Sequence, residues 1–188
     1  MAVNVMLDLE TFGTGNDAAV ISIGAVKFTQ TKVIDRFHVG IDPASSESAG
    51  LKINAATVMW WLDPERAAAW AAWCALEKVD LPLALTGFSM WCDEPPTDSG
   101  DQTHKQGDKL PIWGNGATFD NVILRSSYAA CGLKYPAPFY LDKCYRTAKG
   151  LAPEVKLVRI CTHHSAVDDA ESQAVHLQEI CSRLGVVL

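Results

Sequence analysis

The chain has 188 residues, of which 48% are hydrophobic and 20% are charged, and this balance predicts one globular domain over 1–188 with a full core. The N-terminus has no basic region followed by an apolar stretch, and the apolar run 67–76 is too short to cross a bilayer, so neither a signal peptide nor a membrane span is expected. Six scattered cysteines without a Cys-x-x-Cys pair predict reduced thiols and therefore a cytoplasmic protein.

The charge is unevenly distributed along the chain. A net charge of −6 argues against a nucleic-acid partner, but residues 105–160 hold nine Lys and Arg against four acids. Such a basic segment fits either a phosphate-binding face or an ordinary solvated surface.

The first third of the chain predicts strands. Alternating apolar residues over 3–13 indicate a buried strand, a second strand is expected over 19–28 and a third over 32–39, and 29–31 is short enough for a hairpin turn. Residues 42–50 are rich in Pro, Ser and Gly and predict a loop.

The remainder predicts helices with two further strands. A short helix is expected over 57–62, and a longer one begins with Asp63 as N-cap and Pro64 at its first position and runs to about Val79. The other expected elements are helices over 81–92, 119–131 and 166–184, a flexible excursion over 93–110, a strand over 110–113, and a strand leading into a short helix over 139–147. This order indicates one α/β architecture around a mixed sheet, and no glycine-rich phosphate loop follows the first strand.

Two acids close the first strand. Asp8 and Glu10 are two residues apart, so their side chains share one face of a strand. Two adjacent carboxylates repel each other unless a proton or a cation intervenes, and Mg²⁺ prefers such oxygen ligands. The alternative is a pair of structural carboxylates at a strand end.

A third acid and a histidine cluster follow later in the chain. Asp120 begins a helix after a turn with Gly114 and Gly116, where the helix dipole favours a carboxylate, although plain N-terminal helix acids are common. His164 precedes the last helix, and a neutral imidazole near a metal-bound water is a natural general base. Asp169 lies within the first turn of that helix, free to act as a ligand.

Taken in order, these residues resemble the three motifs of the DnaQ-like (DEDDh) 3′–5′ exonuclease superfamily on the ribonuclease H-like fold. The motifs are Asp8-Leu9-Glu10-Thr11, Ala117-Thr118-Phe119-Asp120, and 164–169. Residues 113–121, Trp60-Trp61 and 145–147 are similar to the branch that contains prophage exonuclease VIII-like proteins and the RNase AS type of exoribonuclease. Gly116 stands where many relatives have Asn; this matches the exonuclease VIII-like branch but leaves the role of Asn115 open.

The resemblance implies a five-stranded mixed sheet whose second strand is antiparallel, flanked by helices. It places Asp8, Glu10, Asp120 and Asp169 around two Mg²⁺ or Mn²⁺ ions, which would stabilise the attacking and leaving oxygens of an in-line displacement. His164 would remove the proton of the attacking water, and the products would be 5′-nucleoside monophosphates released from the 3′ end of single-stranded DNA or RNA.

Two histidines compete for the role of base. His163 and Asp168 have the same spacing as His164 and Asp169. The second pair is preferred because Ala170 after the acid matches the family, and because Ser165 and Asp168 resemble a capping box that gives Asp168 a structural role.

Substrate contacts are expected from the ends of the motifs and from aromatic and basic residues. The substrate-binding set is Thr11, Phe12, Asn115, Trp61 and Arg146. Further candidate phosphate contacts are Arg125, Lys143 and Lys149. Adjacent Trp60 and Trp61 cannot both face one core, so one is expected at the substrate or at a homodimer contact, and the resemblance suggests a homodimer.

The sequence also leaves two other functions open. One is a catalytically idle nucleic-acid-binding protein of the same fold, and the complete set of acids argues against it. The other is a phosphatase or a different ribonuclease H-like nuclease, in which the histidine motif is not expected. The choice between DNA and RNA depends on contacts to the sugar 2′ position, which the sequence does not locate.

Overall fold

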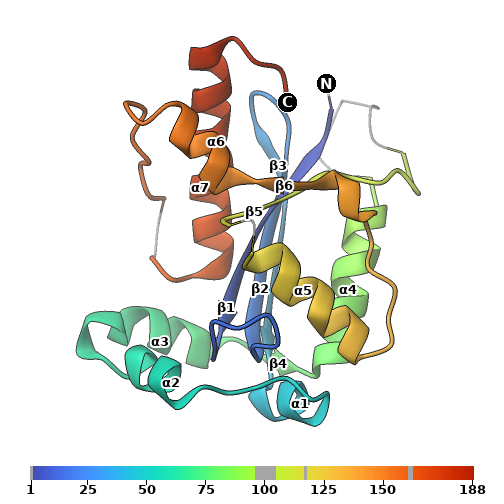
Figure 1. Ribbon diagram of the computed structural model, residues 1–188, viewed down its shortest axis with the longest axis vertical. Coiled ribbons are helices and arrows are strands. Elements are labelled where there is room, and N and C mark those ends of the chain that lie inside the picture. Colours follow the sequence, from blue (N-terminus) through green and yellow to red (C-terminus); the bar gives the residue numbers. More distant parts are fainter. Residues whose placement is uncertain (1, 96–104, 117, 161–162) are drawn as a thin grey trace.

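A mixed β-sheet of six strands runs through the centre of the molecule (Figure 1). The computed structural model describes residues 2–95, 105–116, 118–160 and 163–188. The strands are β1 (Asn4–Thr11), β2 (Val20–Phe28), β3 (Val33–Ile41), β4 (Lys78–Val79), β5 (Ile112–Gly114) and β6 (Asp142–Cys144), in the order β4-β3-β2-β1-β5-β6. Since β2 alone is antiparallel to its neighbours, the expected mixed sheet with an antiparallel second strand is confirmed, with β4 as a sixth strand.

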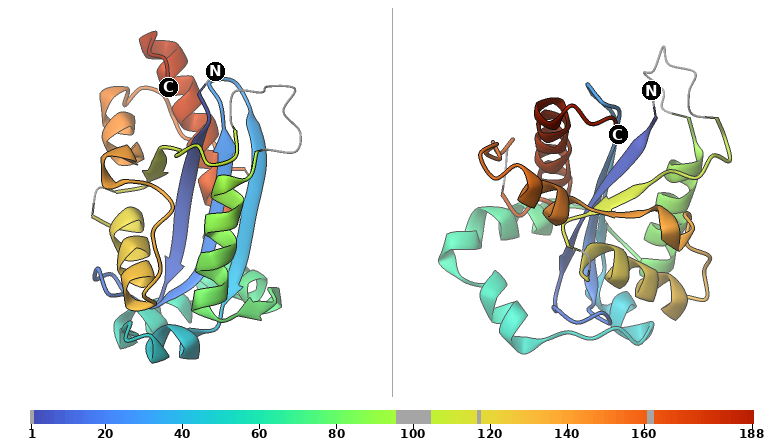
Figure 2. Two further views of the ribbon diagram at one scale, coloured as in Figure 1. Left: turned by 90° about the vertical axis from the view of Figure 1, so that its right-hand side faces the viewer. Right: turned by 45° about the horizontal axis from the view of Figure 1, so that its top comes forward.

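Helices cover both faces of the sheet and one of its ends. Helices α4 (Leu81–Asp93) and α5 (Asp120–Ala130) pack on one face, and α7 (Ala166–Leu184), with α6 (Tyr145–Leu151) against it, packs on the other. Three short helices lie at the end where β1 finishes: α1 (Pro43–Ser48), α2 (Ala55–Trp61) and α3 (Ala67–Ala75) (Figures 1 and 2). No helix among the described residues is long and apolar enough to cross a membrane.

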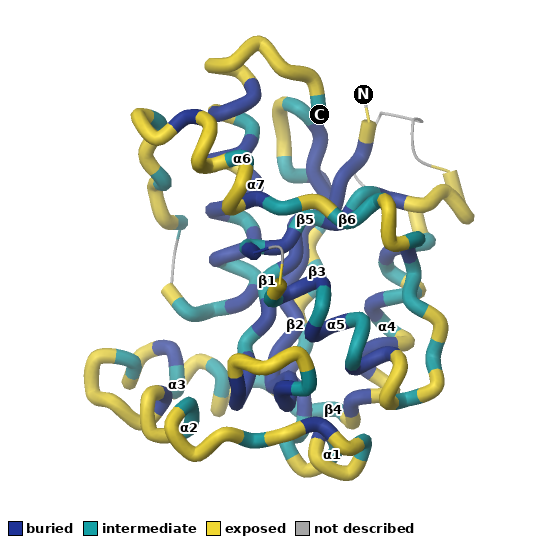
Figure 3. The backbone as a smooth tube through the Cα atoms, in the orientation of Figure 1, coloured by how far each residue is buried: buried dark blue, intermediate teal, exposed yellow. Residues whose placement is uncertain are grey.

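The alternation of β1 divides its side chains between two cores. Val5 and Leu7 belong to the core under α4 and α5, whereas Met6 belongs to the core under α7. Side chains two residues apart share one face of a strand, so Asp8 and Glu10 follow Met6 toward α7. Figure 3 shows the central strands as the most deeply buried part of the chain.

Gly24 lets the start of α7 lie directly on the sheet. It pairs with Asp8 across the β1–β2 ladder, and a Cβ added there would lie 2.1 Å from the backbone carbon of Ala166. Only glycine permits this approach of helix to strand. The close contact brings the first turn of α7 beside the acids of β1.

The predicted loop over 42–50 is wrong, because α1 occupies its centre. Asp42 accepts a hydrogen bond from the Ala44 backbone at 3.0 Å, and Pro43 follows it at the first helical position. An N-cap residue followed by proline is a helix start signal, and the high Pro, Ser and Gly content concealed it.

The predicted helix from Asp63 to Val79 is wrong after Ala75, where α3 ends. Asp63 caps as expected and accepts from the Glu65 backbone at 2.9 Å, but the segment divides into a 3₁₀ turn (Pro64–Arg66), α3, and then β4. Lys78 and Val79 pair with Gly40 and Ile41 of β3. Pairing with a distant strand is a tertiary effect that local helix propensity does not contain.

The other expected elements agree closely with the structure. The last helix begins and ends as predicted, and α5 is followed by Gly132 at a φ of 65°. The strand and short helix expected over 139–147 are β6 and α6, preceded by a 3₁₀ turn (Phe139–Leu141). Residues 96–104 of the predicted excursion lie outside the described residues.

Candidate active site

Three carboxylates converge between β1 and α7. Asp8 and Glu10 come from β1 and Asp169 from the first turn of α7, and one oxygen of each lies within 4.8 Å of the others. Asp120, at the start of α5, is held beside them: its Oδ1 accepts from the Leu9 backbone at 3.2 Å and its Oδ2 from the Asn115 backbone at 2.7 Å. The four acids come from three separate parts of the sequence.

Neighbouring side chains orient these carboxylates. Gln173, one turn after Asp169 on α7, donates from Nε2 to Asp8 Oδ1 at 2.8 Å. Its own Oε1 is buried and accepts no hydrogen bond from any described residue. Asp169 Oδ2 accepts from the His164 backbone at 2.9 Å, and Arg159 Nη1 donates to Asp169 Oδ1 at 2.5 Å.

The acids are electrostatically unfavourable to one another. Burial raises the pKa of Asp8 and of Glu10 well above their usual values, and the negative charges of the neighbouring carboxylates raise them further. Burial also raises the pKa of Asp120 to about 6, against the backbone hydrogen bonds from Leu9 and Asn115 that lower it. Hard, mutually repelling oxygen donors around one point, with an unsatisfied amide oxygen nearby, fit a divalent cation such as Mg²⁺ or Mn²⁺.

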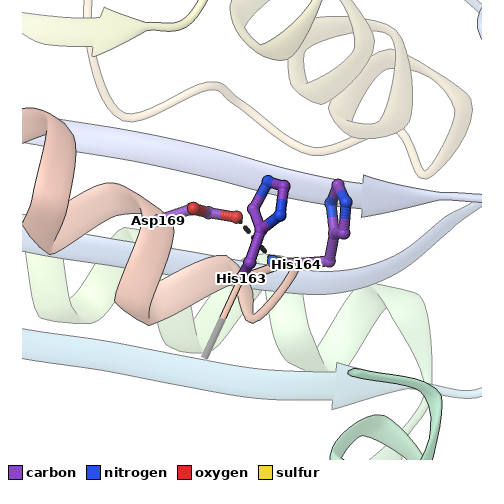
Figure 4. A group of neighbouring side chains, drawn as sticks. All are labelled: His163, His164 and Asp169. Atoms are coloured by element: carbon purple, nitrogen blue, oxygen red, sulfur yellow. Dashed lines mark hydrogen bonds between the residues drawn. The ribbon is translucent and has the colours of Figure 1, made fainter. Parts of the chain in front are cut away.

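Two stacked histidines lie next to Asp169, as Figure 4 shows. The rings of His163 and His164 have centroids 3.7 Å apart, and His164 has a left-handed backbone with a φ of 63°. His164 also meets Trp60 of α2 edge-on at 5.0 Å. Burial lowers the pKa of His164, and the charge of His163 lowers it further, which favours the neutral imidazole that a general base requires.

Two open pockets meet at Leu9 and Glu10. The first is polar and is lined by acids of the cluster, both histidines and two cationic side chains, Lys149 and Arg159. The second is largely apolar, has a volume of about 490 Å³, and lies between the end of β1 and α2, with Trp60, Trp61 and Phe119 in its walls. The site therefore joins a charged recess to an aromatic one.

This combination of fold and site agrees with the match of the sequence to a protein family. The model of the 3′–5′ exoribonuclease Rv2179c-like domain family matches residues 3–181. The chain belongs to this family. It is therefore a 3′–5′ exonuclease domain, and the superfamily expected from the motifs is confirmed, whereas its prophage exonuclease VIII-like branch is not.

Solved structures of exonucleases share the fold at low sequence identity. The nuclease domain of 3′hExo, a DEDDh family member bound to rAMP, has a TM-score of 0.63 at 13% identity, with 99% of this chain and 94% of that chain covered. Exonuclease I of E. coli in complex with a dA16 oligonucleotide has a TM-score of 0.63 at 13% identity, with 97% and 41% covered, so this chain spans less than half of that protein. No curated protein matches the sequence.

Phe12 and Trp61, two of the expected substrate contacts, are buried. Phe12 is 6% exposed and packs against Trp70 and Trp73 of α3, so it is a core residue. Trp61 lies in the wall of the aromatic pocket but is only 2% exposed, and it donates from Nε1 to the Thr11 carbonyl at 3.0 Å. Trp60 is the exposed member of the pair, which confirms that one of the two packs in the core.

The other expected contacts lie at or near the pockets. Thr11 lines the aromatic pocket, and Asn115 lines the polar one. Arg146 on α6 is exposed, and its guanidinium would lie 3.6 Å from a Cβ added at Gly116, in the turn before Asp120. Arg125 instead binds Asp142 through two hydrogen bonds of 2.7 and 2.8 Å, so its guanidinium has a structural role.

The capping box expected at the start of α7 lacks the hydrogen bond that the Ser165 side chain would accept. Ser165 is the N-cap residue, but its side chain makes no capping hydrogen bond. The structure brings both His163 and His164 to the polar pocket, and His164 is the more buried of the two. Ala117 of the second motif lies outside the described residues.

Sequence reasoning missed three residues that build the site. Gln173 follows Asp169 by four residues and therefore shares its helix face, so helical spacing could have identified it. Gly24, inside a strand, carried the signal of a close backbone approach. Arg159 lies between elements, and no local pattern indicated it.

Proposed function

We propose that the chain is a metal-dependent 3′–5′ exoribonuclease that releases 5′-nucleoside monophosphates from single-stranded RNA. The observation that supports this proposal most directly is the convergence of Asp8, Glu10 and Asp169 at the junction of a charged and an aromatic pocket. The 3′-terminal nucleotide of a nucleic acid has two corresponding parts, a charged phosphate and an aromatic base.

Asp8, Glu10, Asp120 and Asp169 would hold two divalent cations, Mg²⁺ or Mn²⁺. Bound there, the cations would supply an activated water and stabilise the charge that develops on the phosphate. Gln173 fixes one oxygen of Asp8, and the His164 backbone fixes one of Asp169, so the chain presents these ligands with little freedom. The hydrogen bond from the Leu9 backbone to Asp120 holds the start of α5 against β1 beside these ligands.

His164 would take the proton of the attacking water. Its ring lies in the pocket that contains the acids, and the ring stack with His163 and the edge contact with Trp60 restrict its rotation. Because burial lowers its pKa, the ring is neutral at neutral pH and has a lone pair to accept the proton.

The aromatic pocket would receive the terminal nucleoside. Trp60, 39% exposed, lines this pocket, and stacking of a base on an aromatic ring tolerates any sequence. Lys149, which lines the polar pocket, and Arg146, close to Gly116, would contact the phosphate. RNA is favoured over DNA because the matched family is one of exoribonucleases.

The test is a time course on 5′-labelled single-stranded RNA and DNA of matched sequence, with Mg²⁺ or Mn²⁺. We expect a ladder that shortens from the 3′ end of RNA and disappears in the Asp8→Asn variant and on chelation. Faster shortening of DNA would overturn the assignment to RNA. No metal-dependent shortening of either polymer would overturn the proposed function and favour a binding protein.

A further inference from the structure

Arg159 places a positive charge inside the carboxylate cluster. Its Nη1 donates to Asp169 Oδ1 at 2.5 Å, and its side chain is 45% exposed whereas that of Asp169 is 11% exposed. Burial raises the pKa of Asp8, and the charge of Arg159 acts in the opposite direction on that group. A single guanidinium therefore offsets part of the repulsion among the acids.

The backbone around Arg159 is anchored while its side chain reaches into open space. Val155 accepts from His176 Nε2 at 3.0 Å, and the Ile160 backbone donates to Ser172 Oγ at 2.9 Å, so both ends of this segment are bound to α7. His176 is in turn bonded to the Tyr145 hydroxyl at 2.6 Å. An arginine on a fixed backbone at the edge of a pocket can change its partner by rotating its side chain alone.

We infer that Arg159 is a resident cation, which neutralises Asp169 while the cluster holds no metal and turns to a phosphate of the nucleic acid once a metal takes its place. The inference rests on the proposed function for its second half. It gives this arginine two successive partners, a carboxylate and a phosphate, whose planar oxygen pairs both suit a guanidinium fork.

Electrostatic repulsion explains why Arg159 would leave Asp169 when a metal binds. A divalent cation bound between Asp8, Glu10 and Asp169 repels a guanidinium that touches one of these ligands, and repulsion between charges a few ångströms apart is strong at a partly buried site. Asp169 does not lose its orientation, because the His164 backbone still donates to its other oxygen. Lys149 lines the same pocket, so the displaced arginine would join a second cation facing the phosphates.

The first experiment measures metal binding without substrate, by titrating metal-free protein with Mn²⁺ in a calorimeter. Arg159→Gln removes the competing charge, so its Kd for Mn²⁺ should be about 5-fold lower than that of the unaltered protein. The melting temperature of the metal-free variant should fall, and Mn²⁺ should raise it by more than in the unaltered protein.

The matched control is Arg36→Gln. Arg36 of β3 also binds a carboxylate of α7, through two hydrogen bonds to Glu171, but it lies outside both pockets. The Kd of the Arg36→Gln variant for Mn²⁺ should equal that of the unaltered protein. If Arg159→Gln binds Mn²⁺ with unchanged or weaker affinity, Arg159 is an orienting partner of Asp169 and the inference is overturned.

The second experiment measures the phosphate contact. With RNA and Mg²⁺, Arg159→Gln should raise KM about 10-fold and lower kcat by less, and Arg159→Lys should recover part of the loss. Anisotropy of a labelled oligonucleotide with Ca²⁺ gives the same comparison without turnover. An unchanged KM and oligonucleotide affinity would overturn the proposed move of Arg159 to a phosphate. Inactivity of the unaltered protein would overturn the proposed function. The Mn²⁺ titration would then still test whether Arg159 competes with metal for Asp169.

Discussion

The buried lysine of β2 and the acids of β1 differ in how far neighbouring groups compensate their charge. Lys27 of β2 is fully buried, yet its ammonium donates to the carbonyls of Trp91 and Glu94 at the end of α4 and lies 4.0 Å from Asp35 Oδ2. The ring of Trp91 lies beneath it, with the nitrogen 4.6 Å from the centroid. Burial lowers the pKa of Lys27, and Asp35 acts against this effect.

The acids of β1 have no comparable compensation. Asp8 and Glu10 lie beside Asp120 and Asp169, and each carboxylate raises the pKa of Asp8 and Glu10 after burial has already done so. A buried charge with satisfied partners supports a fold, whereas clustered like charges oppose it. At one end of the sheet the compensated charge of Lys27 supports the fold. At the other end the acids of β1 lower stability and serve binding.

Asp8→Asn should produce the largest change and test the comparison directly. Loss of a metal ligand should lower kcat on the order of 10³-fold, since ions of this kind supply several kcal/mol of transition-state stabilisation. The metal-free variant should nevertheless melt at a higher temperature than the unaltered protein, because one repelling charge is gone. Asp17→Asn, at an exposed acid that binds Lys52, is the control and should change neither quantity appreciably. A metal-free variant that melts lower would show that the acids are compensated after all.

His164→Ala should come next, with a loss of kcat of roughly 10²- to 10³-fold, the usual contribution of a general base. His163→Ala should lose less than about 10-fold, because His163 is the more exposed ring and acts only by stacking on His164. Steady-state kinetics on RNA would measure both. The reverse order of effects would assign the base to His163.

Lys27→Met should affect stability and leave catalysis intact. The carbonyls of Trp91 and Glu94 lose their donor, so the free energy of unfolding should fall by about 2 kcal/mol, with kcat per folded molecule unchanged. Chemical denaturation would measure the difference. Lys52→Met removes a lysine that is 75% exposed, and its ion pair with Asp17 should contribute little to stability. Equal effects of the two substitutions would contradict the structural role of Lys27.

The pH dependence of the metal-free protein should give the smallest effect. The folded pKa values of Asp8 and Glu10 lie above their usual values near 4, and that of Asp120 is about 6, so the folded state binds more protons than the unfolded state across this range. The stability that these groups contribute is fully present below pH 4 and is lost as the pH rises through their folded pKa values. Melting curves in a chelator should therefore show a steeper loss of stability, as the pH rises above about 4, for the unaltered protein than for Asp8→Asn. Parallel curves would exclude a raised pKa at Asp8.

Local pattern predicted the elements that are long and regular. The spacing of apolar residues gave the bounds of α7, and alternation along β1 put Asp8 and Glu10 on one face. It failed where the deciding interaction was distant: β4 exists because Lys78 and Val79 meet β3, and Phe12 is buried because α3 folds over it. The choice between Trp60 and Trp61 likewise depended on the hydrogen bond to Thr11.

The sequence by itself determined which residues are chemically able to form the site and on which faces of their strands and helices they lie, since both follow from residue type and a fixed period. Only the tertiary structure decided that Asp8, Glu10 and Asp169 lie within 4.8 Å of one another, that Gln173 holds Asp8, and that Arg159 reaches Asp169. The reason is physical: distances between segments are set by how helices pack on the sheet, here by the contact of Ala166 with Gly24, and no local property of the chain contains them.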